Sequence, residues 1–103
     1  MRLGIVVTDE RFGRQALGLA RAAVQRGWPV RCFFTDTGVR LVTDPVFADV
    51  AQQPGVELAL CELSLERYGS GGMDPGRLAE QVIVGGQYQD AELVRHSDKV
   101  LVF

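Results

Sequence analysis

The sequence predicts a single α/β domain of three layers, α/β/α, around a mostly parallel sheet of about five strands. Three observations lead to this prediction. Short runs rich in β-branched residues alternate with amphipathic helical segments along the 103 residues. Several runs, such as LGIVV and VLVF, are continuously apolar, which is typical of strands that helices cover on both faces. The length suits one domain, which can bury a core without a disulfide or a metal.

The first part of the chain is predicted to hold two strands and one long helix. Residues 3–8 form a strand, and residues 11–26 form a helix in which apolar positions recur at helical spacing. Gly27 suits the residue that ends such a helix, and Pro29 prevents its continuation. A second strand covers residues 30–35, and a turn covers residues 35–38. The apolar face of the helix consists of Ala16, Leu17, Ala20, Ala23 and Val24.

The middle of the chain is predicted to hold the third strand between two helices. Residues 39–42 are compatible with either a strand or a helix. Residues 45–53 are predicted to be helical, with Asp44 as the N-cap and Pro54-Gly55 as the stop. A third strand covers residues 56–60. A short helix follows over residues 61–68 and ends near Gly69.

The last third returns to the same alternation. Residues 70–72 are predicted to be a glycine-rich loop, and a helical turn starts at Asp74. A short strand over residues 82–84, a helix over 88–96 and a final strand over 99–103 complete the domain. The helical turn contains Leu78 and Ala79. In the helix over 88–96, Ala91 and either Val94 or Leu93 are expected to face inward.

Composition and charge narrow the classes of function. The net charge of −2 and the pI near 5.3 argue against a nucleic-acid platform, which would carry a basic stripe. No stretch approaches the ~18 consecutive apolar residues of a membrane span, and no run of like charge favours a membrane surface. The N-terminal segment does not resemble a secretory signal. We therefore expect a cytoplasmic protein whose two cysteines are free thiols.

Candidate reactive residues are expected at one edge of the sheet. In open parallel sheets, ligands and reactive groups gather beyond the carboxyl ends of the strands. Residues 8–13, residues 35–38 and Cys61 follow the first three predicted strands. Cys61 is therefore a candidate by position, and Asp9 and Asp36 are candidates in the two loops.

Two interpretations of Cys61 stay open at this point. A thiol reacts as its thiolate, and the N–H groups at a helix start favour that form, whereas Glu62 and Glu66 oppose it. Arg67 offsets those charges only if the fold brings it to the sulfur. The alternative is that Cys61 packs as a small apolar residue, since free cysteine is among the most buried residue types. Cys32, in the middle of a strand and on one face with Val30 and Phe34, is expected to pack.

The sequence contains little that indicates a metal, cofactor or phosphate site. His96 is the single histidine, and no Cys/His cluster surrounds it, so we expect neither a metal nor a bound cofactor. The loop after the first strand, TDERFGRQ, is not a phosphate-binding motif.

Three segments together resemble the DsrE/TusD-like (DsrE/DsrF-like) family of sulfur-relay proteins. Residues 16–39, ALGLARAAVQRGWPVRCFFTDTGV, are similar to the family's helix, glycine, strand and Asp-Gly-Val turn, here with Thr37 inserted. Cys61 stands where the family has its sulfur-accepting cysteine, with Arg67 and Gly69 after it. The tail, VIVGGQYQDAELVRHSDKVLVF, resembles the family's last strand, helix and strand.

The resemblance implies a flavodoxin-like, DsrEF-like fold and a specific activity. Cys61 would accept sulfane sulfur as a persulfide and pass it on, with Arg67 or backbone N–H groups stabilising the persulfide anion. The protein would be a sulfurtransferase or persulfide carrier without a cofactor, in a sulfur-oxidation or tRNA-thiolation type of pathway. Its partners would be sulfur-donor and sulfur-acceptor proteins, and it would form a homo- or hetero-oligomer, a trimer or hexamer. Candidate subunit contacts are Phe33, Val42, Phe47 and Tyr88.

Two other functions remain open. Relatives without the cysteine serve as scaffolds, so the chain could be an assembly subunit in which Cys61 is packed. A flavodoxin-like module that binds a small molecule or nucleotide through the Asp9 and Asp36 loops is the third possibility, and the missing phosphate loop disfavours it.

Overall fold

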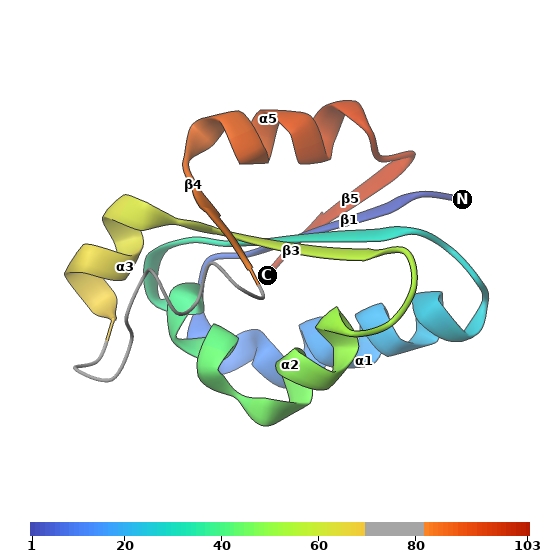
Figure 1. Cartoon of the computed structure of the whole chain (residues 1–103), viewed down its shortest axis with the longest axis horizontal. Helices are drawn as coiled ribbons and strands as arrows, with labels where there is room; N and C mark the ends of the chain where they lie inside the picture. Colours follow the sequence, from blue (N-terminus) through green and yellow to red (C-terminus); the bar gives the residue numbers. More distant parts are fainter. Residues whose placement is uncertain (70–81) are drawn as a thin grey trace.

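Five parallel strands form the centre of the molecule in the computed structural model, which describes residues 1–69 and 82–103 (Figure 1). The order across the sheet is β4-β3-β2-β1-β5. The strands are β1 (Leu3–Val7), β2 (Val30–Phe34), β3 (Val56–Cys61), β4 (Ile83–Gly85) and β5 (Lys99–Val102). The α-helices are α1 (Gly13–Gln25), α2 (Pro45–Ala51), α3 (Glu62–Tyr68) and α5 (Gln87–Arg95), and the 3₁₀ helices are η1 (Glu10–Phe12) and η2 (Asp36–Thr43). The predicted three-layer α/β/α architecture is confirmed.

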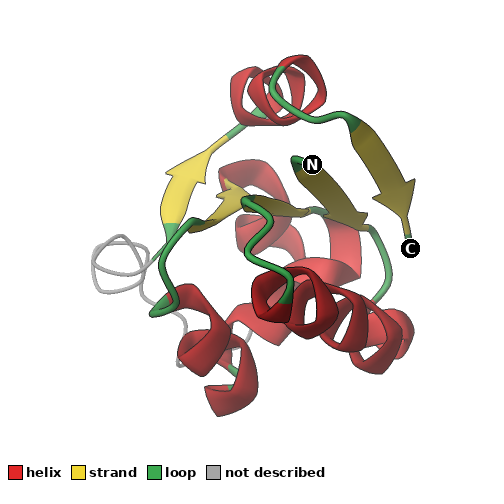
Figure 2. Ribbon diagram, turned by 90° about the vertical axis from the view of Figure 1, so that its right-hand side faces the viewer, coloured by secondary structure: helices red, strands yellow, loops and turns green. Residues whose placement is uncertain are grey.

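The direction of each connection explains which face each helix covers. From β1 to β2 to β3 the chain steps the same way across the sheet, and right-handed crossovers place α1 and α2 on one face. The return from β4 to β5 runs the opposite way and places α5 on the other face (Figures 1 and 2). Helix α5 therefore covers its face of the described structure without a second helix beside it.

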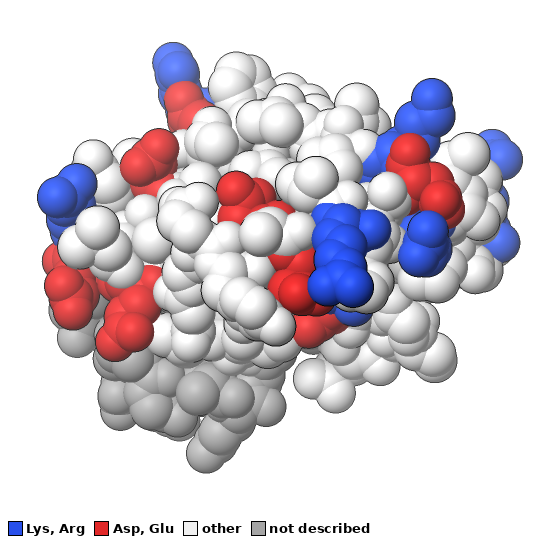
Figure 3. Space-filling view, turned by 90° about the horizontal axis from the view of Figure 1, so that it is seen from above, with Lys and Arg blue, Asp and Glu red and all other residues white. Residues whose placement is uncertain are grey.

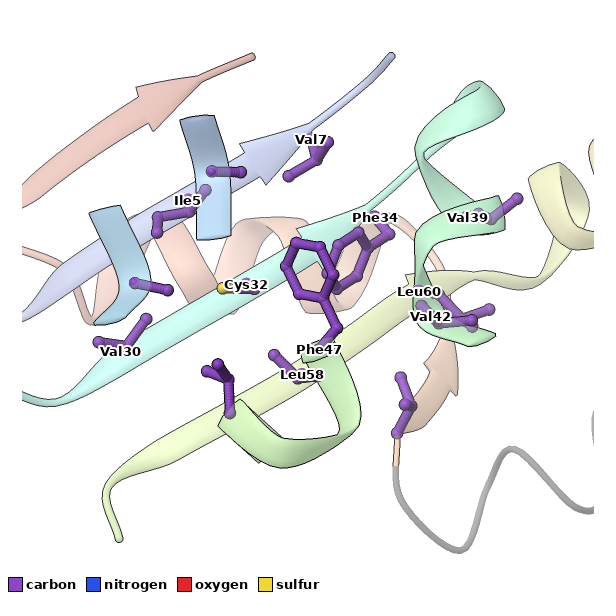
Figure 4. Close-up of a cluster of buried hydrophobic side chains, with 14 of the residues drawn as sticks. Ile5, Val7, Val30, Cys32, Phe34, Val39, Val42, Phe47, Leu58 and Leu60 are labelled. Atoms are coloured by element: carbon purple, nitrogen blue, oxygen red, sulfur yellow. The ribbon is translucent and has the colours of Figure 1, made fainter. Parts of the chain in front are cut away.

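The larger hydrophobic core lies between the sheet and the α1 and α2 layer. The predicted apolar face of α1 is confirmed, since Ala16, Ala20 and Ala23 are buried. Phe47 of α2 packs edge-on against Phe34 of β2, with ring centroids 5.3 Å apart (Figure 4). The strand residues of this core include Ile5, Val7, Val30, Cys32, Phe34, Leu58 and Leu60. Cys32 thus shares a face with Val30 and Phe34, as predicted.

A smaller core lies on the opposite face, under α5. It contains Phe33 of β2, Ala59 and Cys61 of β3, and Leu93 of α5. Side chains alternate along a strand, so Leu58 and Leu60 point to the α1 and α2 layer while Cys61 points to the α5 side. The side of the sheet on which Cys61 lies is thereby set by the register of β3.

The backbone resolves one local ambiguity and agrees with two predicted helix ends. Residues 39–42, compatible with a strand or a helix, belong to the 3₁₀ helix η2. Asp44 caps α2 as predicted, because its side chain accepts the N–H of Val46 at 2.9 Å. Gly27 follows α1 with φ of 73°, a left-handed conformation that favours glycine. The predicted loop at residues 70–72 and the helical turn from Asp74, with Leu78 and Ala79, lie outside the described residues.

Some predictions of burial and contact were wrong. In α5 Ala91, predicted to face inward, is exposed; of the two alternatives Leu93 and Val94, Leu93 faces inward and Val94 is exposed. Three of the four residues proposed for subunit contacts, Phe33, Val42 and Phe47, are core residues. The fourth, Tyr88, is 70% exposed. Period alone indicates which residues share a face, but the side of α5 that meets the sheet depends on its position over the strands. Seen from the α5 side, acidic and basic side chains lie scattered among uncharged ones (Figure 3).

Gly4→Ala is expected to destabilise the fold because α5 lies directly on β1 at this residue. A Cβ atom at Gly4 would stand 2.6 Å from Cδ2 of Leu93 and 2.6 Å from Oγ of Ser97. Moving α5 outward to relieve this overlap should cost about 1–3 kcal/mol of unfolding free energy. The matched control is Gly18→Ala in α1, where a Cβ meets nothing within 4 Å and should stabilise the helix by ~0.5–1 kcal/mol. Urea denaturation measures both, and equal stability of the two variants would contradict the close contact.

No helix in the described part of the chain is long and apolar enough to cross a membrane.

Candidate functional site

The carboxyl ends of β3 and β4 form the point where the chain changes from one face of the sheet to the other. After β3 the chain enters α3, whose Leu65 belongs to the core shared with α1 and α2. After β4 it enters α5 on the opposite face (Figure 1). In open α/β sheets such a divergence of neighbouring connections creates a crevice that commonly holds the active site. Cys61, the last residue of β3, lies here in register with Gly85, the last residue of β4.

Cys61 is also the N-cap of α3. Its backbone is extended, with φ of −82° and ψ of 118°, and the helix begins at Glu62. The residue is buried, with 7% of its surface exposed, and its side chain makes no capping hydrogen bond of regular geometry. The N–H groups of Leu63 and Ser64, at positions N2 and N3, nevertheless lie close enough to stabilise a thiolate.

Two hydroxyl groups lie beside this thiol. Ser64 is buried in α3, and its Oγ accepts the backbone N–H of Asp36 at 2.9 Å. The Oγ1 of Thr35, which follows β2, lies 3.2 Å from Ser64 Oγ. Thr35 adjoins Cys61 because β2 and β3 pair in parallel up to Phe34 and Leu60. Strand pairing and helix α3 together bring the two hydroxyls to the carboxyl end of β3, where Cys61 lies.

The pKa values of the two cysteine thiols are shifted in opposite directions. Burial raises the pKa of the Cys61 thiol, but hydrogen bonds from the Ser64 hydroxyl, the Ser64 and Leu63 N–H groups and the Thr35 hydroxyl outweigh it. The net result is a pKa of Cys61 below the ordinary value of 9.0. Burial without such partners raises the pKa of Cys32 to about 12. Both thiols are free, but only Cys61 is held in a setting that favours the reactive form.

The backbone between β2 and η2 is shaped to reach this site. Asp36 has φ of 49°, a left-handed conformation that aspartate tolerates better than most residues. This conformation directs its N–H toward Ser64 Oγ. Gly38 then lies so close to β1 that an added Cβ would collide with the carbonyl oxygen of Val7. A glycine is required there for η2 to approach the sheet.

The two loop aspartates lie at the predicted edge of the sheet, but neither directs its carboxylate to the Cys61 sulfur. Asp9 caps η1 and forms an ion pair with Arg11, with 2.7 Å between Oδ2 and Nη2. Hydrogen bonds from Arg11 lower the pKa of the Asp9 carboxyl. The Asp36 side chain is exposed, and the residue reaches the site with its backbone N–H.

Arg67 lies at the other end of α3 from Cys61. It is exposed in the last turn of the seven-residue helix, about 9 Å further along the axis at 1.5 Å per residue. Hydrogen bonds, rather than the charge of Arg67, account for the lowered pKa of Cys61. Stabilisation of a persulfide by Arg67 stays a prediction, and the described geometry does not bring the two groups together.

The sequence did not single out Ser64, Thr35 or Arg40. Arg40 connects η2 with η1 and with the end of α3. Its Nη1 lies 2.9 Å from Oε1 of Glu10, and its Nε donates to the carbonyl of Tyr68 at 2.7 Å. Ser64 lies three residues after Cys61, so it is on the first turn of any helix that Cys61 starts, but its residue type matches no capping motif. Thr35 and Arg40 are distant in the chain from α3, so no local pattern indicates them.

His96 is placed away from this edge. It is the C-cap of α5, next to the start of β5, and its Nε2 lies 2.9 Å from Oε2 of Glu92. No group of three or more histidine, cysteine, aspartate or glutamate side chains suited to a metal ion occurs within residues 1–69 and 82–103.

A scan against protein-family models finds no match, and a search of curated proteins finds no significant similarity.

Proposed function

We propose that the protein is a sulfur-relay protein that carries sulfane sulfur as a persulfide on Cys61. The observation that carries this proposal is the contrast between its two thiols. Cys61 lies at the switch point of the sheet with hydrogen-bond donors around a thiol of lowered pKa, whereas Cys32 is enclosed in the core. The resemblance of residues 16–39, of the Cys61 segment and of the C-terminal tail to the DsrE/TusD-like family supports the same activity.

The chemistry needs only thiol–persulfide exchange. The thiolate of Cys61 attacks the outer sulfur of a donor persulfide, R–S–SH. A new S–S bond forms on Cys61, the donor S–S bond breaks, and the donor leaves as the thiolate R–S⁻. An acceptor thiolate then attacks the outer sulfur of Cys61–S–SH and regenerates the Cys61 thiolate. Each step moves one sulfane sulfur, with no net oxidation, and a lowered pKa of Cys61 favours it both as nucleophile and as leaving group.

The partners in this scheme are proteins that donate and accept persulfide sulfur. Because Cys61 is 7% exposed, a donor must present its sulfur on a narrow projecting group rather than on a flat surface. We place the activity in the cytoplasm, where the thiols stay reduced.

A second candidate is a cysteine-independent assembly subunit, and one feature favours it. An apolar groove runs between α1 and the edge strand β5, lined in part by Leu19, Trp28 and Leu101. Strand β5 is the outermost strand of the sheet on that side, and its Val102 is exposed (Figure 2). Exposed apolar edges of this kind are suited to contacts between subunits.

Transfer of sulfur to the reduced protein is expected to add one sulfur atom at Cys61. Incubation with a small-molecule or protein persulfide, followed by intact-mass measurement, should show a gain of about 32 Da that a reductant reverses. The gain should persist in Cys32→Ala and disappear in Cys61→Ser, because a pKa raised to about 12 leaves almost no Cys32 thiolate to attack the donor. Cys32→Ala is chosen because serine would bury a hydroxyl in the core.

The outcome separates the two candidates. Uptake that depends on Cys61 supports the relay. A folded wild-type protein that takes up no sulfur, while Cys61→Ser keeps the same oligomeric state, points to the assembly subunit instead.

A further inference from the structure

Strand β5 forms one edge of the sheet and is open to a further strand. It follows β1 in the order β4-β3-β2-β1-β5, and no strand lies beyond it within residues 1–69 and 82–103. Natural proteins usually protect such an edge with charged residues, proline, a bulge or a very short strand. The other edge, β4, has three residues, whereas the segment from Lys99 to Phe103 contains no charged side chain or proline after Lys99. An apolar edge of this kind is suited to pairing with another strand.

The backbone of β5 shows which residues are available for that pairing. The N–H of Phe103 donates to the carbonyl of Val6 at 2.8 Å, and the carbonyl of Phe103 accepts the N–H of Thr8 at 2.6 Å. Both polar groups of Phe103 therefore face β1. Because alternate residues of a strand face the same neighbour, the backbone groups of Val100 and Val102 face away from β1. Two N–H groups and two carbonyl groups thus point outward from the sheet, with no strand partner in the described residues.

The side chains of β5 are apolar on both sides of these open backbone groups. Leu101 is 45% exposed and lines, with Leu19 and Trp28, a groove of about 510 Å³ on the α1 side. Val100 packs on the smaller core under α5, and Val102, on the same face of the strand, is 66% exposed. A strand that pairs with β5 therefore meets apolar side chains on both faces of the sheet.

We propose that β5 pairs in antiparallel fashion with β5 of a second copy of this chain, about a two-fold axis at Leu101. In this register Val100 of each copy lies opposite Val102 of the other, so that the outward N–H and carbonyl groups form four hydrogen bonds. Leu101 meets Leu101 of the second copy on the α1 side. Lys99 lies opposite Phe103 of the second copy and not opposite the second Lys99, so the register keeps the like charges of β5 apart.

A second copy fits this edge better than an unrelated strand, because the edge complements itself. Two-fold pairs are the commonest assemblies of soluble proteins, and they require a surface whose residues match under rotation. The molecule measures 36 × 25 × 25 Å, so even its smallest side covers 25 by 25 Å, or about 600 Å². Contact over one such side in each copy buries roughly 1,200 Å² in total, the lower end of the range for stable complexes. Cys61 lies three strands away from β5, so the pairing neither covers it nor depends on its chemistry.

The test is the molar mass in solution, measured by light scattering at micromolar to millimolar protein concentration. The wild-type protein should reach twice the mass of the chain. Leu101→Glu and Leu101→Lys should each raise the dissociation constant of the dimer at least about tenfold, because like charges then meet on the axis. An equimolar mixture of the two variants should recover the dimer, since the facing charges become opposite. The matched control is Leu63→Glu, at a leucine of α3 with 55% exposure, which should leave the wild-type mass unchanged.

Val102→Pro tests the backbone pairing independently of side-chain charge. Proline removes the outward N–H of Val102, which has no partner in β1, so the fold should persist. The dimer should lose the two symmetry-related hydrogen bonds that this N–H donates, and its dissociation constant should rise at least about tenfold. The control is Val102→Thr, which keeps the N–H and the shape of the side chain and should dimerise as the wild type does.

Several results would overturn the proposal. A wild-type protein that stays monomeric at millimolar concentration, or forms a trimer, has no two-fold pairing. A dimer that Val102→Pro leaves as tight as the wild type, in a folded protein checked by thermal denaturation, uses another surface; this variant decides even if the Leu101 variants do not fold. Folded Leu101 variants whose mixture stays monomeric would reject the axis at Leu101. A hexamer that Leu101→Glu divides into trimers would support the pairing. None of these readouts depends on sulfur transfer, so the relay and the dimer can fail separately.

Discussion

Iodoacetamide is expected to modify Cys61 in the native protein and to leave Cys32 unmodified. The pKa of Cys32 is raised to about 12, so at pH 8 only about one molecule in 10⁴ carries a thiolate there. The pKa of Cys61 lies below 9.0, so its thiolate fraction is larger by several orders of magnitude. Because the thiolate is the form that reacts, the rate at Cys61 should rise with pH through a midpoint below 9. Peptide mapping after a timed reaction measures both sites.

Unfolding provides the internal control for this contrast. In denaturant the two thiols lose their surroundings and should react at similar rates, with their pKa values close to each other. Modification of both cysteines at similar rates in the folded protein would show that the environment of Cys61 is not special. It would leave the relay without the observation that now carries it.

Phe47→Ala is expected to produce a large loss of stability. Phe47 is 2% exposed, and its ring packs edge-on against Phe34 at 5.3 Å between centroids (Figure 4). It is the link between α2 and the centre of the sheet. Removing the ring loses the transfer free energy of its apolar surface and leaves a cavity, which together cost about 3–5 kcal/mol. That is a large part of the ~5–15 kcal/mol by which small domains are stable.

The matched control is Phe12→Ala on the surface. Phe12 lies in η1 with 40% of its surface exposed and contacts the Arg11 guanidinium. Its removal should cost less than about 1 kcal/mol. Urea denaturation of both variants tests the assignment of the core, and a similar loss for the two would contradict it.

The elements that the sequence predicted best are those whose signals are local. Helix α1 was predicted with its buried face, and Asp44 was predicted as a cap, because periodicity and capping depend on neighbours in the chain. The orientation of α5 was only partly predicted. Leu93, Ala91 and Val94 are all plausible inward residues by spacing, and contact with β1 at Gly4 selects Leu93.

The candidate site shows the same division. Cys61 was located at the end of a strand and the start of a helix from the sequence alone, and its position in the structure agrees. Its surroundings were not predicted in the same way. The sequence set the N–H groups of the helix start against the charges of Glu62 and Glu66 without ranking them. In the structure the N–H groups of Leu63 and Ser64 do lower its pKa, together with the hydroxyls of Ser64 and Thr35, which the sequence did not indicate. Hydrogen-bond partners from another strand are set by register, which no local pattern encodes.

By itself, the sequence determined the α/β class, the alternation of elements and the place of Cys61 between β3 and α3, since each depends on hydrophobic period and turn chemistry over a few residues. The tertiary structure alone decided the order β4-β3-β2-β1-β5 and the side of the sheet that α5 covers. It also decided that Thr35 and the Asp36 amide meet Ser64 next to the sulfur. The physical reason is that these features depend on contacts between residues far apart in the chain, which are selected by the packing of the whole domain.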